Sequence, residues 1–177
     1  MNSFKKLALA IISCATFLTG CGYTTSSTLP SSIDSIYVEK MANKIDFTDE
    51  SRRNLYLPLL EVDVHNAIKN RFLYDGNLEI GDENSADLRL KGELRSYDRV
   101  GLRFTENDDV EEYRVMITVH LEMYDNDTQE LMWTEESFVG EATYFVSGSQ
   151  ATTEESAVKE AIVDLSRRIV ERTVEAW

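Results

Sequence analysis

Three long stretches in the second half of the chain alternate apolar and polar residues, the pattern of a strand with one buried face. They occupy residues 86–99, 111–125 and 130–145. In the middle stretch Val115, Ile117 and Val119 share one face, whereas Arg114 and Thr118 share the other. Two short polar connections, 106–109 and 125–128, are rich in residues that favour turns. The pattern therefore predicts an antiparallel meander with one apolar face.

Two amphipathic helices are predicted to cover that face. The first spans residues 56–74, with Gly76 ending it, and the second begins at Thr152, which has capping-box spacing with Glu155, and runs almost to Trp177. Apolar residues recur every three or four positions in both: Leu57, Leu60, Val64, Ala67, Ile68 and Phe72, then Val158, Ile162, Leu165 and Ile169. Short strands are expected at 35–39 and 78–80, and a surface loop at 41–54. The predicted fold is α+β with two layers: two helices packed on one face of a mixed, mostly antiparallel four- to five-stranded sheet.

The N-terminus has the features of a lipoprotein signal. Lys5 and Lys6 precede an apolar run, residues 7–18, which is too short to span a bilayer. Leu18-Thr19-Gly20-Cys21 resembles a bacterial lipobox. The resemblance implies cleavage before Cys21 and acylation of that cysteine, and several acyl chains anchor a protein firmly. We therefore expect a signal peptide at 1–20, a lipidated tether at 21–32 and a single domain at 33–177.

Composition narrows the classes of function. Lys and Arg number 18 against 32 Asp and Glu, for a net charge of −14. Generic binding to nucleic acid or to anionic lipid is disfavoured by that balance. Cleavage before Cys21 would remove Cys14, the other cysteine, so no disulfide is expected and hydrophobic packing must supply the stability.

No catalytic residue, cofactor or metal site is predicted. The two histidines, His65 and His120, stand outside any nucleophile or metal-ligand motif, and surface positions are expected for them. Residues 125–127 begin like a calcium loop, but Glu130 occupies the position that needs glycine. The chain is therefore expected not to be an enzyme.

One group of residues runs against the acidic composition. Arg89, Lys91, Arg95, Arg99 and also Arg103 stand at even spacings, so a regular strand would present them as one row of cations. The first interpretation is pairing with glutamates of the neighbouring strands, such as Glu112, Glu122 and Glu135. The second is an anion platform for lipopolysaccharide, since arginine forks suit phosphate oxygens.

Several short motifs, in order, resemble the lipopolysaccharide-assembly lipoprotein family, LptE. They are Cys21-Gly22-Tyr23, Leu29-Pro30, Ile36-Tyr37-Val38, Asp75-Gly76, Ala86-Asp87-Leu88, Glu112-Tyr113-Arg114-Val115, Leu131-Met132-Trp133 and the closing helix. The resemblance spans nearly the whole chain after Cys21.

The resemblance implies an outer-membrane lipoprotein that forms a complex with the LptD β-barrel, as plug and assembly factor for lipopolysaccharide transport to the cell surface. Gly22 after the cysteine also favours the outer membrane, and the protein would lie at its periplasmic face or in the barrel lumen. The acidic composition departs from family members whose proposed lipopolysaccharide contacts are basic. The alternative is a lipoprotein activator of a peptidoglycan synthase, which needs a longer tether than residues 22–32.

Overall fold

The structure is a computed structural model that describes residues 29–30, 32–46 and 57–175. The lipobox and Cys21 lie outside these ranges. The strands are β1 (Ser35–Val38), β2 (Ala42–Asn43), β3 (Glu79–Ile80), β4 (Leu88–Phe104), β5 (Val110–Asp125) and β6 (Leu131–Phe145); the helices are α3 (Leu60–Asp75) and α4 (Glu154–Glu175). Neither helix of the described residues is long and apolar enough to cross a membrane.

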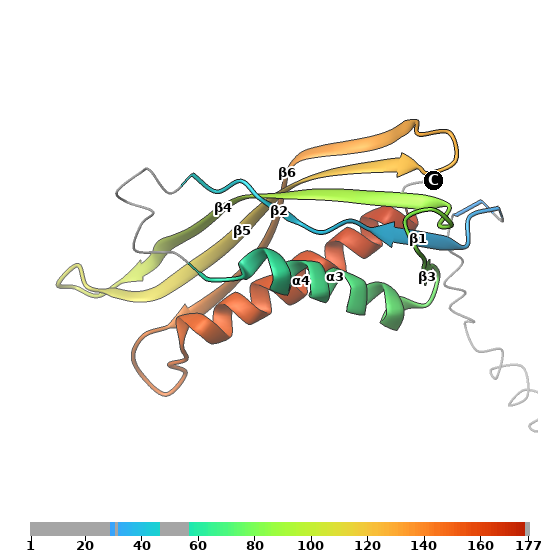
Figure 1. Ribbon diagram of the computed structural model, residues 1–177. Helices are drawn as coiled ribbons and strands as arrows, with labels where there is room; N and C mark the ends of the chain where they lie inside the picture. The colour runs from blue at the N-terminus through green and yellow to red at the C-terminus, as the bar shows by residue number, and fades with distance from the viewer. Residues whose placement is uncertain (1–28, 31, 47–56, 176–177) are drawn as a thin grey trace, which may run out of the picture.

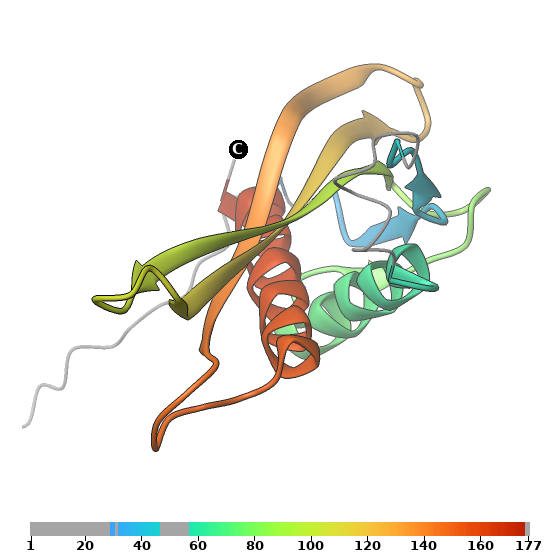
Figure 2. The ribbon, with the colours of Figure 1, turned by 90° about the vertical axis from the view of Figure 1, so that its left-hand side faces the viewer.

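The strands form one mixed sheet in the order β3-β1-β4-β5-β6, and β2 also pairs with β4. Strands β4, β5 and β6 are the antiparallel meander that the sequence predicts, whereas β1 and β2 run parallel to β4. Both helices lie on the same side of the sheet (Figure 1), and the turned view shows the opposite side uncovered by helix (Figure 2). The two-layer α+β prediction is confirmed, with six strands in place of four or five.

The core lies between the sheet and the helices. Every second residue of β5 from Val115 to Met123 is fully buried. In the helices, the predicted stripe residues Val64, Ile68, Phe72, Leu165 and Ile169 are buried to 1% exposure or less, whereas Ala67 is only partly buried. Gly76 ends α3 in the left-handed conformation, with φ 77°, as predicted. The side of the sheet that faces the helices is therefore apolar because the alternation of the sequence makes it so.

Helix α4 approaches β6 at Gly140. A Cβ atom on Gly140 would lie 2.5 Å from the carbonyl oxygen of Ala161 and 2.8 Å from the Cα of Leu165, and it would also meet the Cβ of Leu165. Real Cβ atoms do not come this close to backbone atoms. Glycine at this position, facing Ala161, allows the close contact between helix and sheet.

Three details of the local prediction were wrong. Helix α3 begins at Leu60, because Leu59 adopts a left-handed conformation (φ 63°) after Pro58. The N-cap of α4 is Thr153, whose hydroxyl accepts the Ser156 amide at 3.1 Å, so the cap lies one residue after the predicted Thr152 and the predicted capping box with Glu155 does not form.

The third wrong detail is the surface loop expected at residues 41–54, of which 47–54 lie outside the described residues. Its first part contains strand β2, and the Met41 side chain is buried at 7% exposure. Met41 packs where Gly92 leaves room on β4. The polar composition of this stretch concealed its pairing with β4.

Asp87 fastens the start of β4 to the start of β1. Its carboxylate accepts hydrogen bonds from the Asp34 and Ser35 amides, at 3.0 and 2.9 Å, and from the Ser35 hydroxyl at 2.7 Å. The Ser35 hydroxyl accepts the Asp87 amide in return at 3.0 Å. These donors, the Ser35 hydroxyl foremost, lower the pKa of the Asp87 carboxyl.

Candidate interaction surface

A β-bulge divides the predicted row of cations. Leu94 pairs with Val119 and Ser96 with Thr118, so Arg95 is the extra residue of β4. Before the bulge the buried residues of β4 are even-numbered, and after it Tyr97 is the buried one. The expectation of one row on one side was therefore wrong, because it required a regular strand.

Two of the cations, Arg89 and Lys91, lie on the sheet face away from the helices. Arg89 pairs with Glu39 at 2.9 Å, and its guanidinium lies over the Tyr124 ring, 4.8 Å from the centroid. Lys91 pairs with Glu122 at 2.7 Å. The Lys91 ammonium, as hydrogen-bond donor, lowers the pKa of the Glu122 carboxyl. Lys91 is thus held by a carboxylate of the neighbouring strand β5, and Arg89 by the carboxylate that directly follows β1.

The other cations lie elsewhere. Arg95, at the bulge, pairs with Glu93 at 2.7 Å and its side chain is 46% exposed. Arg99 points to the helical side and pairs with Glu154, in the first turn of α4. Arg103 pairs with Glu112 at 3.5 Å. Pairing with glutamates of the neighbouring strand therefore describes Lys91 and Arg103, which pair with β5. Arg95 pairs within β4 and Arg99 with α4, and Glu135 pairs with Arg172.

Glu154 collects three donors on the helical side of the sheet. It accepts the Tyr97 hydroxyl at 2.7 Å, the Tyr144 hydroxyl at 3.3 Å and the Arg99 guanidinium. Tyr144 stacks on Tyr113 with 5.5 Å between ring centroids. Burial and the hydrogen bond to Glu154 both raise the pKa of Tyr97. The cluster joins the projecting end of the β4–β5 hairpin to α4.

Both histidine side chains pack against other parts of the fold. His120 is buried at 8% exposure on the outer face, against the surface position that we expected, and its ring nitrogens lie 3.5 Å from Glu122 and 3.4 Å from Glu136. His65 lies 3.0 Å from the Glu39 carbonyl oxygen, and burial lowers its pKa. Among the described residues no group of His, Cys, Asp and Glu could hold a metal ion.

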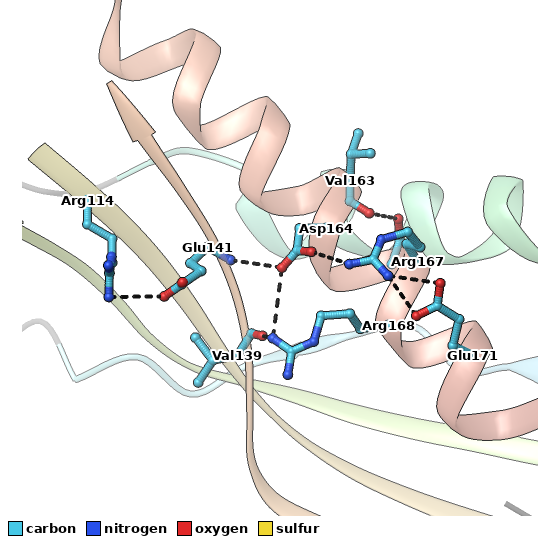
Figure 3. A network of polar contacts seen from close by, with 9 residues as sticks. Arg114, Val139, Glu141, Val163, Asp164, Arg167, Arg168 and Glu171 are labelled. Carbon is cyan, nitrogen blue, oxygen red and sulfur yellow. Dashed lines mark hydrogen bonds and ion pairs between the residues drawn. The ribbon is translucent and has the colours of Figure 1, made fainter. Parts of the chain in front are cut away.

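Strand β6 forms one edge of the described sheet, and α4 covers part of that edge (Figure 3). The Arg168 guanidinium donates to the Val139 carbonyl, and the Asp164 carboxylate accepts the Glu141 amide at 3.3 Å. Farther along, the Phe145 carbonyl accepts the Thr152 amide at 2.9 Å. Sequence patterns could not reveal this edge, since it depends on which strand comes last in the sheet.

These features define a class of protein: a two-layer α+β domain with a charged, ion-paired outer sheet face. Solved structures of similar fold include a protein from Xanthomonas campestris (TM-score 0.56, 10% identity, covering 84% of this chain and 88% of that one). Lipoprotein B from Nitrosomonas europaea has a TM-score of 0.55 and 12% identity, with 82% and 84% covered. A minor lipoprotein from Acinetobacter baumannii has a TM-score of 0.53 and 14% identity, with 81% and 94% covered.

At these identities the solved structures show the fold alone. No curated protein matches the chain. The family model described as LptE, lipopolysaccharide-assembly, matches residues 33–174. The chain therefore belongs to the LptE family, and the resemblance seen in its short motifs is confirmed. Family membership supports a role in lipopolysaccharide assembly rather than in catalysis.

Proposed function

We propose that this chain is an outer-membrane lipoprotein, anchored through acylated Cys21, that plugs the LptD β-barrel and assists its assembly for lipopolysaccharide transport. The observation that carries the proposal is the LptE family match over residues 33–174, nearly the whole predicted domain. The fold suits a plug in two ways. The closed two-layer core makes the domain rigid. The polar outer face of the sheet matches the polar side chains that line the lumen of such a barrel.

The outer sheet face supplies the polar surface that this role needs. The described part of this face carries the Arg89–Glu39 and Lys91–Glu122 pairs and the polar residues between them. The first pair joins β4 to the residue after β1 and the second joins β4 to β5, so each positive charge lies next to a negative one and the face does not present charge of one sign. A face of this kind can exchange hydrogen bonds with a barrel wall with little rearrangement.

Purification from membranes tests the partner. After detergent extraction, the tagged full-length protein is expected to bring down an outer-membrane β-barrel in a stable complex, identified by mass spectrometry. Cys21→Ser, which removes the acylation site, is expected to abolish anchoring of the protein to the membrane. Recovery of a peptidoglycan synthase in place of a barrel would refute the plug role.

We also propose that lipopolysaccharide phosphates bind Arg89, Lys91 and Arg95 by displacing the carboxylates that pair with these side chains. Arg99 instead pairs with Glu154 at the start of α4. Replacing Arg89, Lys91 and Arg95 by Ala is then expected to weaken lipopolysaccharide binding and to leave the circular dichroism spectrum intact. The matched control is Arg167→Ala/Arg168→Ala/Lys159→Ala, which removes the same charge from α4. Unchanged binding by the triple variant would return the three residues to cross-strand pairing alone.

A further inference from the structure

Among the described residues, the contacts with the backbone of the β6 edge lie in its second half, whereas α4 reaches the first half through side chains, with Arg172 against Glu135 and the Trp133 ring. From Val139 to Phe145 the edge backbone is engaged by Arg168, Asp164 and Thr152. The other half, residues 131–136, belongs to the same edge strand, and its Leu131, Thr134 and Glu136 are exposed. Strand edges that carry no cover are templates for pairing with another extended chain.

The negative charge around residues 131–136 favours a basic partner. Residues 125–136 contain Asp125, Asp127, Glu130, Glu135 and Glu136 but no Lys or Arg. Glu135 is paired with Arg172 at 2.9 Å, whereas Glu136 lies 3.4 Å from the His120 ring and its side chain is 82% exposed. A second copy of this chain paired edge to edge would bring acidic residues against acidic residues, which is unfavourable. A basic extended segment would meet the opposite charge.

A cavity at the start of the edge gives a seat for one side chain. It has a volume of about 330 Å³ and is lined by Asp125, Glu130, Leu131 and Met132. Its lining combines the apolar residues Leu131 and Met132 with two carboxylates, a combination that suits the methylene stem and the charged head of Lys or Arg. The cavity lies at the beginning of β6, directly after the β5–β6 turn.

We propose that the edge of β6 at residues 131–136 binds an extended, basic segment of a partner protein by strand addition. Main-chain hydrogen bonds supply the pairing, and Glu130 and Glu136 supply the preference for Lys and Arg. The capped half, 139–145, sets where the added strand must stop. Binding of a basic segment at this edge does not require LptD as the partner. The pull-down can therefore fail to recover a barrel while the edge still binds the segment.

The test uses the full chain in detergent and a synthetic ten-residue peptide in which Lys alternates with Thr and Val. Two control peptides are the same sequence with alternate backbone amides N-methylated, and a version with Glu in place of Lys. Fluorescence anisotropy measures affinity, and hydrogen exchange locates the protected amides. We expect the first peptide to bind and to protect residues 131–136, and both controls to bind at least about tenfold more weakly.

A charge-reversal pair of variants completes the test. Glu130→Lys/Glu136→Lys is expected to weaken the peptide about tenfold, since each exposed charge pair contributes on the order of 1 kcal/mol or less. Glu106→Lys/Asp109→Lys, on the β4–β5 turn, changes the net charge equally and is expected to have less than about a twofold effect. Equal binding of the N-methylated peptide, absence of binding, protection confined to 139–145, or dimerisation of the protein through this edge in sedimentation would each overturn the proposal.

Discussion

The contact between α4 and β6 at Gly140 yields the sharpest prediction about stability. In Gly140→Ala the new methyl group would meet the Ala161 carbonyl oxygen at 2.5 Å and the Leu165 Cα at 2.8 Å. Both are backbone atoms of one helix, so relief requires the whole helix to move away from the sheet. Overpacking of a core commonly costs about 1–3 kcal/mol, and this case belongs at the upper end.

Part of that cost is offset in the unfolded chain. Replacing glycine by alanine reduces unfolded-state entropy, which favours the folded state by about 0.4–1 kcal/mol. The net expectation is a loss of about 2 kcal/mol in the free energy of unfolding. For a protein of this size, that corresponds to a fall in Tm of about 4–8 °C. In urea titrations followed by circular dichroism, the midpoint should fall with little change in slope.

Gly92→Ala is the matched control. A Cβ atom there would also be crowded, at 2.6 Å from the Sδ and 2.7 Å from the Cε of Met41. Those two atoms are the far end of a flexible side chain, which can rotate away. We expect a loss of under about 1 kcal/mol. If Gly92→Ala were as destabilising as Gly140→Ala, the distinction between backbone and side-chain crowding that underlies this reasoning would be refuted.

Two further predictions concern polar contacts. Asp87→Asn keeps the shape of the tie to Ser35 but removes its charge, and we expect a loss of about 1 kcal/mol at neutral pH. Because folding lowers the pKa of this carboxyl, its contribution is present above about pH 4 and is lost as the pH falls through the folded value; urea midpoints of the two proteins should therefore converge in acid, and a constant gap would argue against the charge. Glu154→Gln is expected to lower the pKa of Tyr97 toward its ordinary value, since a carboxylate that disfavours the phenolate is gone. Ultraviolet titration of the tyrosines measures this, with Tyr97→Phe identifying the band; an unmoved titration would leave burial as the whole cause.

Much of the architecture was predictable from the sequence. Alternation in β5 placed Val115 to Met123 on one face, and the structure buries those residues. The stripe of α4, the stripe of α3 from Leu60 to Phe72 apart from the half-buried Ala67, and the stop at Gly76 were also predicted correctly. These features depend on the intrinsic periods of strand and helix, which repeat every two and about 3.6 residues and leave their mark in any local window. The lipid anchor and the tether stay predictions, because residues 1–28 lie outside the described structure.

The candidate surface was less predictable. No sequence signal near Arg95 predicts a bulge. One extra residue in β4 nevertheless moves Arg99 from the sheet face that carries Lys91 to the face that carries the helices. The ties of Asp87 to Ser35 and of Arg99 to Glu154 join residues 52 and 55 positions apart. The position of β6 at the edge follows from the order of strands in the sheet.

The difference between the features that the sequence predicted and those that it did not has one physical reason. A periodic pattern reports whether a residue faces water or protein, because burial of apolar side chains is selected at each position separately. Register, strand order and the partners of charged groups are set by pairs of segments that meet only when the chain has folded. The sequence by itself therefore determined the layers, the apolar faces and the family of this protein. Only the tertiary structure decided which cations share a surface, what holds each of them and which backbone remains for a partner.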